Sequence, residues 1–467
     1  MNAPERGMDL ASQLRRQHTG LDATYCLDST PVLERQSQQE SNARSYPRRI
    51  PLVLERARGI YVQDSRGQVF VDCLAGAGTL ALGHNHPVVV EAIHAAMASD
   101  LPMHTLDLTT PVKDAFVQEL FGSLPPAFAS QARIQFCGPT GADAVEASLK
   151  LARTTSGRQN VLAFQGAYHG MTLGTLSISG NLGPKNALGG LLSGVQMLPY
   201  PHDYRCPFGA GGEQAIDLNL HYIEQLLSDP ESGITSPGAL ILEPVQGEGG
   251  VISAPDRWLQ GLRRITQERG IALIVDEIQC GIARTGKMFA FEHAGVVPDI
   301  MPLSKAIGGG LPLAVVVYRA DLDLWQPGAH AGTFRGNQLA MAAGTATLRY
   351  LKEHAVAEHA NRVGQRLRGH MLKLQSAFAW IGDVRGRGLM LGMEIVDPDG
   401  TADLQGHPPA HSAKAKQFQR ACLERGLILE LGGRHGATVR LLPPLIITEG
   451  EVDFVGEIMF ASAAAIR

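Results

Sequence analysis

One lysine of this sequence is well placed to react with a carbonyl compound. Lys305 lies in the run from Pro302 to Gly310, which ends in three successive glycines. Such a run holds the backbone in a tight, irregular turn. A lysine removed from water there has a lowered pKa and can act as an imine-forming amine and a proton carrier. The alternative is an ordinary solvated charge on the surface.

An aspartate follows the apolar run Ile271–Val275, which has the composition of a strand buried on both faces. Asp276 would then stand at the carboxyl end of a parallel strand, where α/β folds bind their ligands. A buried carboxylate requires a cationic or hydrogen-bonding partner. A solvent-exposed strand end is the alternative, and it would carry no function.

Two further segments combine glycine with polar or aromatic residues. Thr140 and Asp143 have the spacing of a capping box around Gly141 and Ala142. The first N–H groups of such a helix favour an anion such as phosphate, although an ordinary capped helix has the same pattern. Tyr168 lies on a glycine-flanked loop and could stack on a flat ring or be a half-buried loop aromatic.

Together and in chain order, these segments supply a phosphate cradle, a stacking ring, a strand-end carboxylate and an amine. Pyridoxal phosphate requires this set, because its phosphate must be anchored, its ring clamped, its ring nitrogen kept protonated and its aldehyde bound to a lysine. The run Gly76-Ala77-Gly78 with Ala81 matches a dinucleotide-binding pattern, but Gly83 and Pro87 prevent the helix that this pattern must open. An NAD-dependent dehydrogenase is therefore rejected. The pair His84 and His86 lacks zinc-site companions, so no metal site is expected.

Apolar runs alternate with amphipathic helical patterns from about residue 130, which predicts an α/β fold around a mostly parallel sheet. The predicted strands are Arg133–Cys137, Asn160–Phe164, Ala239–Leu242, Ile271–Val275 and Leu313–Tyr318, and the predicted helices include Ala142–Arg153 and Asp256–Arg269. A smaller α+β lobe is predicted from a long helical pattern starting at Gln338, from Leu389–Ile395, from a helix near Ala413–Arg425 and from strands at Leu427–Leu431 and Thr438–Leu442. The strand pair Ile60–Val62 and Val69–Asp72 is expected to join that lobe.

The predicted division is an N-terminal arm at 1–50, the first part of the small domain at 51–95, a large cofactor-binding domain at 96–345 and the rest of the small domain at 346–467. The 467 residues carry 41 Lys and Arg against 45 Asp and Glu, a balance that offers no field for nucleic acid or an anionic membrane. No apolar run approaches the length of a spanning helix, and the N-terminus shows no secretory signal. Six scattered cysteines without a CxxC pair are typical of a reduced, cytoplasmic protein.

Beyond these patterns, the sequence resembles the class III (ω-amino-acid) aminotransferases of PLP fold-type I over about residues 45–460. The resemblance rests on blocks in family order, which are Gly138–Glu146, Glu243–Gly250, Asp276–Gln279 with Arg284-Thr285-Gly286, Ser304-Lys305, Gly332-Thr333-Phe334 and Arg440–Leu445. It implies a large domain with a mostly parallel central sheet and a smaller α+β domain. It also implies at least a homodimer, and a dimer of dimers is compatible with it.

The resemblance assigns roles to individual residues. Lys305 would bind pyridoxal phosphate covalently, Asp276 would pair with its ring nitrogen, and Gln279 would face its ring hydroxyl. Tyr168 would stack on the ring, and the N–H groups of Gly141 and Ala142 would hold the phosphate. Thr333 would reach the phosphate in the neighbouring subunit. The substrate would meet Tyr46, Arg440 and Glu248, the last serving as the carboxylate that pairs with Arg440.

Two blocks, Ser41–Arg48 and Leu74–Pro87, resemble diaminobutyrate–2-oxoglutarate aminotransferases. The expected reaction moves the terminal amine of L-2,4-diaminobutyrate to 2-oxoglutarate, giving L-aspartate 4-semialdehyde and L-glutamate. Siderophore, ectoine or 1,3-diaminopropane pathways use these products. Ornithine-type relatives carry an arginine just after the stacking aromatic, where this chain has Met171. That weakens an ornithine or acetylornithine assignment but leaves other ω-amino donors open, including 4-aminobutyrate and polyamines.

Overall fold

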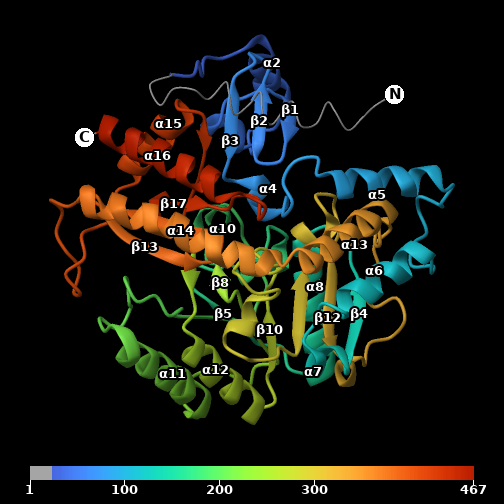
Figure 1. Ribbon diagram of the computed structural model, residues 1–467. Helices are drawn as coiled ribbons and strands as arrows, with labels where there is room; N and C mark the ends of the chain where they lie inside the picture. The colour runs from blue at the N-terminus through green and yellow to red at the C-terminus, as the bar shows by residue number, and fades with distance from the viewer. Residues whose placement is uncertain (1–23, 467) are drawn as a thin grey trace.

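Seven strands form the central sheet of the computed structural model, which describes residues 24–466 (Figure 1). The strands are β4 (Ala132–Phe136), β5 (Val161–Phe164), β6 (Val195–Leu198), β7 (Ala239–Leu242), β10 (Ala272–Val275), β11 (Ile300–Leu303) and β12 (Val315–Arg319). Their order is β4-β12-β11-β10-β7-β5-β6. Strand β12 runs antiparallel to both of its neighbours, and the other pairs are parallel. The prediction of a mostly parallel sheet is confirmed.

The sheet is buried on both faces, which explains the continuous apolar runs of its strands. Side chains alternate between the two faces of a strand. In β7, Leu240 and Leu242 pack into one core, whereas Ala239 and Ile241 pack into a second core on the opposite face. Strand β10 divides in the same way, with Leu273 in the first core and Ile274 in the second. No strand of this kind can show the alternation of a half-exposed strand.

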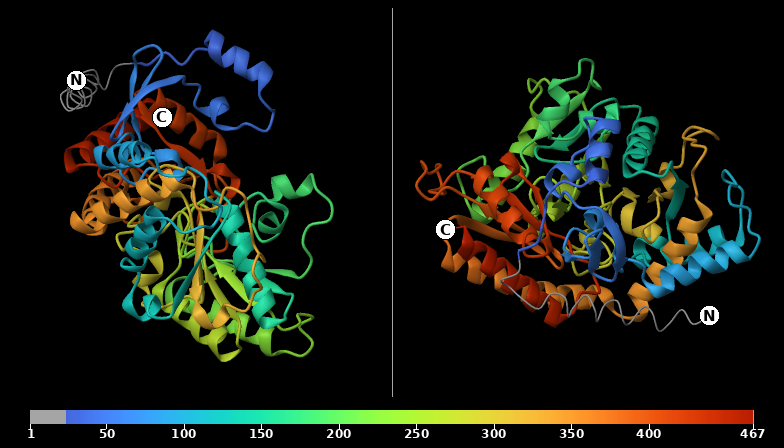
Figure 2. Two further views of the ribbon diagram at one scale, coloured as in Figure 1. Left: turned by 90° about the vertical axis from the view of Figure 1, so that its right-hand side faces the viewer. Right: turned by 90° about the horizontal axis from the view of Figure 1, so that it is seen from above.

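Helices cover both faces of this sheet. Helix α8 (Gly141–Ser156) supplies most of the helical residues of the second core. Helices α6 (Pro111–Phe121), α12 (Asp256–Glu268) and α13 (Gln338–Glu353) supply residues to the first. The remaining helices of this part are α5 (Pro87–Ala98), α7 (Pro126–Ala129), α9 (Leu173–Ser177), α10 (Leu182–Asn186) and α11 (Gly212–Ser228). Figure 2 shows the sheet edge-on between these layers.

The beginning and the end of the described chain meet above the central sheet, as both figures show. The first small sheet contains β1 (Leu54–Arg58), β2 (Tyr61–Asp64), β3 (Val69–Asp72) and β15 (Leu427–Ile428), and β3 pairs in parallel with β15. The second contains β13 (Ile381–Arg387), β14 (Met390–Ile395), β17 (Thr438–Leu441) and β16 (Glu430–Gly432). Helices α14 (Val356–Ala377), α15 (Ser412–Leu423) and α16 (Glu449–Ala465) belong with them. The N-terminal strand pair therefore joins the C-terminal lobe, as predicted.

Two details differ from the expectations, and the arm adds two short helices. The long helical pattern from Gln338 forms two helices, because Ala355 takes a left-handed conformation (φ 48°) and ends the first of them. The predicted strand Leu427–Leu431 forms two strands, β15 and β16, which belong to different sheets. The arm contains helices α2 (Pro31–Gln39) and α3 (Tyr46–Arg49), while its first 23 residues lie outside the described part. The division at 50, 95 and 345 stays a prediction.

Further features of the structure bear on the glycine pattern near residue 76, the cysteines and the membrane question. The pattern Gly76-Ala77-Gly78 lies within the short helix α4 (Ala75–Gly78), in which Gly76 and Ala77 have positive φ. It therefore does not open a helix of the dinucleotide-binding kind. The hairpin β8 (Val245–Gln246) and β9 (Ile252–Ser253) completes the strands. All six cysteines are free. Within residues 24–466, no helix combines the length and the apolar character that crossing a membrane requires.

Candidate active site

A cavity of about 510 Å³ gathers most of the predicted site residues. It lies where β5, β7, β10 and β11 end, because the segments that follow these strands line it. Its walls include Gly141, Ala142, Tyr168, Glu248, Asp276, Gln279 and Lys305. These residues are up to 164 positions apart in the sequence and meet because parallel strands bring their carboxyl ends to one edge of the sheet.

The first turn of α8 forms one end of the cavity. Thr140 is the N-cap, and its side chain accepts a hydrogen bond from the N–H of Asp143 at 3.3 Å. The second half of the predicted capping box is absent, because the Asp143 carboxylate accepts the N–H of Gly138 at 2.5 Å and faces His330 Nε2 at 3.1 Å. Gly141 and Ala142 carry first-turn N–H groups, which no carbonyl within a helix can pair, and both line the cavity.

Asp276 is buried, and its partner is a histidine that the sequence did not identify. His169 Nδ1 lies 2.7 Å from Asp276 Oδ2, and Oδ1 accepts the N–H of Ile278 at 3.0 Å. Burial alone would lower the pKa of His169. The hydrogen bond to Asp276, together with the charges of Asp276 and Glu243, outweighs that effect and raises it. The requirement for a partner was recognisable in the sequence, and His169 follows the predicted stacking residue directly.

Lys305 points into the same cavity from the 3₁₀ turn Lys305–Gly308. Its backbone has φ 52°, a conformation that non-glycine residues rarely adopt and that often marks a functional position. Within residues 24–466, its ammonium group has no hydrogen-bond or ion-pair partner. Burial lowers the pKa of Lys305, and the nearby charges of Glu248, Asp276 and Glu243 offset this only in part. The arrangement suits an amine that must lose its proton.

An ion pair closes the cavity on the side of the small sheets. Arg440 Nη2 donates to Glu248 Oε2 at 2.9 Å, and Nη1 lies 2.9 Å from Oε1. Arg440 is 1% exposed in strand β17, whereas the Glu248 side chain is 36% exposed and lines the cavity. Burial raises the pKa of Glu248, but the charges of Arg440 and Lys305 outweigh this and leave it below its ordinary value.

Glu243 supports the loop that carries these groups. Its two carboxylate oxygens accept the N–H groups of Tyr168 at 2.9 Å and Gly247 at 3.0 Å. Burial raises the pKa of Glu243 to about 7, a shift that the charge of His169 opposes and that of Asp276 reinforces. No local pattern in the sequence distinguishes this residue from the rest of the block Glu243–Gly250.

Three of the predicted residues do not line the cavity. Arg440 reaches it through Glu248, as described. Tyr46, in helix α3, is 42% exposed, and burial together with the charges of Glu430 and Glu248 raises its pKa. Thr333 is exposed on the loop before α13, where its carbonyl accepts from His104 Nε2 at 2.7 Å.

The residues present fit pyridoxal phosphate. Two buried polar atoms of cavity-lining residues, His169 Nε2 and Gln279 Oε1, have no hydrogen-bond partner among the described residues. An unpaired buried acceptor or donor is costly and indicates a missing ligand group. Gln279 Nε2 is held by the carbonyl of Ala77 at 3.1 Å, so its Oε1 is free to accept a hydroxyl. The helix N-terminus can take a phosphate at the opposite end.

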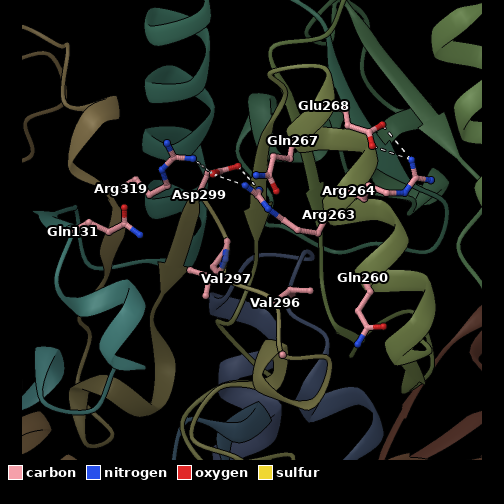
Figure 3. A pocket seen from close by; sticks show the side chains of 12 residues that line it. Gln131, Gln260, Arg263, Arg264, Gln267, Glu268, Val296, Val297, Asp299 and Arg319 are labelled. Atoms are coloured by element: carbon pink, nitrogen blue, oxygen red, sulfur yellow. Dashed lines mark hydrogen bonds and ion pairs between the residues drawn. The ribbon is translucent and has the colours of Figure 1, made fainter.

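A larger hollow of about 750 Å³ lies at another part of the central sheet and contains none of the predicted residues (Figure 3). Its charged groups are paired. Asp299 accepts from Arg263 Nη1 at 2.6 Å and from Arg319 Nη1 at 2.7 Å, and Arg264 pairs with Glu268 at 3.1 Å. The two Asp299 pairs connect α12 and β12 to the residue before β11, so these charged side chains have a structural role.

One possible metal-ligand group occurs in the described part. Atoms of Cys137, Asp143 and His330 lie within 4.8 Å of one another. Asp143 and His330 already contact each other, and the Asp143 carboxylate also accepts the N–H of Gly138. The expectation of no metal site stays a prediction.

Comparison with known proteins gives one consistent assignment. The family model "Aminotransferase class-III" matches residues 42–462. The chain is 55% identical over 442 residues to a diaminobutyrate–2-oxoglutarate aminotransferase of Rhizobium meliloti, covering 95% of this chain and 94% of the relative. It is 51% identical to a protein of the same name from Haemophilus influenzae, covering 90% and 92%. An amine transaminase from an uncultivated Pseudomonas species, solved with PLP bound, superposes with a TM-score of 0.81 at 29% identity, covering 91% and 98%. The chain therefore belongs to the class III aminotransferase family, whose members have the PLP type I fold.

Proposed function

We propose that this protein uses pyridoxal phosphate to transfer the terminal amino group of L-2,4-diaminobutyrate to 2-oxoglutarate. The products would be L-aspartate 4-semialdehyde and L-glutamate. The names of the two relatives above support the substrates, since both align with this chain over nine tenths or more of its length. The structural observation that carries the proposal is the single cavity in which an unpaired lysine, the Asp276–His169 pair and Glu248 face one another.

Each residue has a chemical task in this proposal. Lys305 would hold the cofactor covalently, and as a free amine it would carry the proton to and from the reacting carbon of the substrate. Asp276 keeps the ring nitrogen protonated, and His169 fixes the orientation of its carboxylate. Tyr168 stacks on the ring, Gln279 accepts the ring hydroxyl, and Gly141 and Ala142 bind the phosphate. When bound, pyridoxal phosphate supplies the electron sink that makes the reacting carbon acidic.

The Glu248–Arg440 pair lets one cavity accept two differently charged substrates. Diaminobutyrate enters with its terminal amine first and places no carboxylate beside the reacting carbon. An unpaired, buried Arg440 would then be unfavourable, and Glu248 neutralises it. Glutamate and 2-oxoglutarate bring a carboxylate to this position, so Glu248 must turn away and release Arg440. Tyr46 would contact the substrate from the arm.

We also propose a homodimer in which Thr333 serves the neighbouring subunit. Thr333 is exposed in the single chain, and the adjacent Phe334 is 68% exposed. Met97, Met103 and Leu108 add further large apolar side chains with more than half of their surface exposed. Exposed apolar groups of this size are typical of surfaces that a partner covers. Analytical ultracentrifugation should give about twice the chain mass, or a multiple of it.

The decisive experiment for the substrate is a panel of amine donors with 2-oxoglutarate as the common acceptor. Diaminobutyrate should give the highest kcat/KM. A higher kcat/KM for ornithine, acetylornithine, 4-aminobutyrate or a polyamine would show that the protein is a different ω-amino-acid transaminase. A location in the cytoplasm and a role in siderophore biosynthesis stay predictions that this panel does not address.

A further inference from the structure

A separate cavity of about 310 Å³ lies behind the loop that carries Glu248. We call it the basic cavity, because its lining includes Arg205, Arg385, Arg434, His202, His407 and His435. Gly249, the neighbour of Glu248, also lines it. The N–H of Gly433, next to Arg434, donates to the carbonyl of Glu248 at 2.8 Å. The basic cavity and the catalytic cavity therefore share a wall of backbone.

Two of its three arginines are neutralised by carboxylates. Arg205 Nε donates to Glu394 Oε1 at 2.9 Å, and its Nη1 donates to Asp403 at 2.9 Å. Arg385 Nη1 donates to Glu394 Oε2 at 2.9 Å and to Asp383 at 2.7 Å. These contacts resemble the paired arginines of the larger hollow in Figure 3, and they explain the positions of both side chains.

Arg434 is different, because it has no ion pair and no side-chain hydrogen bond within residues 24–466. Its guanidinium lies near Gly166, where a Cβ atom built on that glycine would be 3.2 Å from Nη2. Arg434 lines the cavity and is exposed to solvent, and the charge of Glu394 acts on it, but no carboxylate of the described residues forms an ion pair with it. A guanidinium in this situation is suited to a carboxylate or a phosphate, which it can bind through two parallel hydrogen bonds.

His202 provides a second, independent observation. It is 5% exposed and lines the basic cavity, yet neither ring nitrogen has a hydrogen-bond partner among the described residues. Buried polar atoms are normally paired, so two unpaired nitrogens on one ring indicate a ligand or ordered group that is not part of the chain. Burial, together with the charges of Arg385, Arg434 and Arg205, lowers the pKa of His202 to about 2. It stays neutral there and has one N–H to donate.

We propose that the basic cavity binds a small oxyanion, a carboxylate or a phosphate, with Arg434 as the charged anchor and His202 as a hydrogen-bond donor. None of the catalytic roles above uses either residue, so this proposal goes beyond the proposed function and does not depend on it. A cavity of this volume is at the lower end of small-molecule sites and accommodates inorganic phosphate or a short dicarboxylate.

Isothermal titration calorimetry on the cofactor-loaded protein tests this without any amine donor, so turnover does not enter the result. The probes are inorganic phosphate and, separately, succinate at constant ionic strength. We expect at least one of them to bind with one site per chain. The tighter probe then identifies the phosphate or the carboxylate as the preferred group.

Three variants locate the bound anion. Arg434→Gln should weaken binding about tenfold or more, because it removes the one arginine of the lining that has no ion-pair partner among the described residues. Thr401→Trp, at an exposed position of the same cavity, keeps the charges but fills space, and it should weaken binding too. Arg368→Gln, an exposed arginine on α14 outside the lining, removes the same charge and should change nothing.

The proposal is overturned if neither probe binds, or if Arg434→Gln and Thr401→Trp both leave the affinity unchanged. It is also overturned if binding survives in those two variants but disappears in Arg440→Met, because the anion would then occupy the catalytic cavity.

Discussion

The guanidinium of Arg440 faces both carboxylate oxygens of Glu248 at 2.9 Å, across a sequence separation of 192 residues. Arg440 lies in a buried strand of the small sheets, whereas Glu248 lies in the turn of the β8–β9 hairpin and is open to the cavity. One partner is fixed and the other can move. This asymmetry is the basis of the proposed exchange between the two substrates.

Removal of the mobile partner should shift the substrate preference. In Glu248→Ala, Arg440 stays free, so its guanidinium is always available to the α-carboxylate of glutamate, whereas diaminobutyrate meets an unpaired positive charge. We expect the ratio of kcat/KM for glutamate to kcat/KM for diaminobutyrate to rise about tenfold, equivalent to about 1.4 kcal/mol. Single-turnover half-reactions with each amino acid measure it. Glu248→Gln keeps the shape and should shift the ratio in the same direction. An unchanged ratio would show that Glu248 is not the switch.

Lys305→Ala should abolish turnover, since no other described lysine lines the cavity. The cofactor can still bind through Asp276 and the helix N-terminus, so absorbance should show a bound cofactor without the covalent lysine linkage. Rates of each half-reaction and the visible spectrum are the measurements. Activity close to that of the original protein would contradict the assignment of Lys305.

Asp276→Asn should affect rate much more than stability. The amide keeps the size of the side chain but cannot hold a proton on the ring nitrogen, so we expect a loss of about 10²–10⁴-fold in kcat. The free energy of unfolding should fall by only about 1–3 kcal/mol, the cost of a weakened buried hydrogen bond to His169. Kinetics and urea unfolding on the same preparation separate the two effects. A mild rate effect would mean that another group protonates the ring.

The raised pKa of His169 predicts that the stability of the cofactor-free protein depends on pH. Because Asp276 and Glu243 raise the pKa of His169 above its ordinary value of 6.5, the folded state retains a proton that the unfolded state loses. The stabilisation is complete below pH 6.5 and is lost as the pH rises through the raised value. Urea unfolding midpoints between pH 6 and pH 9 should fall more steeply in the original protein than in His169→Asn. Parallel pH profiles would contradict the raised pKa.

Much of the fold could be predicted because its strands are long apolar runs buried on both faces. Ala239–Leu242 was predicted with its observed bounds, and β10 differs from its prediction by one residue. The break at Ala355 could not be predicted, because no glycine or proline marks it. The separation of β15 from β16 depends on which strand lies beside each one, and local sequence carries no information about that.

Some site residues could be predicted from local sequence and others could not. The strand-end position of Asp276 and the glycine turn of Lys305 follow from local sequence. The roles of Arg440 and Glu248 came only from the family resemblance, because no spacing rule links residues so far apart. The sequence does not identify His169 as the partner that a buried Asp276 requires, since many polar groups could satisfy that carboxylate. The unpaired state of Arg434 could be seen only once its neighbours were known.

The most direct test of the central claim follows a labelled nitrogen. Diaminobutyrate carrying ¹⁵N only at its terminal amine is incubated with 2-oxoglutarate and the cofactor-loaded enzyme, and the glutamate formed is examined by mass spectrometry. The proposed reaction places the label in nearly all of the glutamate, and diaminobutyrate labelled at its α-amine gives unlabelled glutamate. Label arriving from the α-amine, or no glutamate at all, would contradict the account.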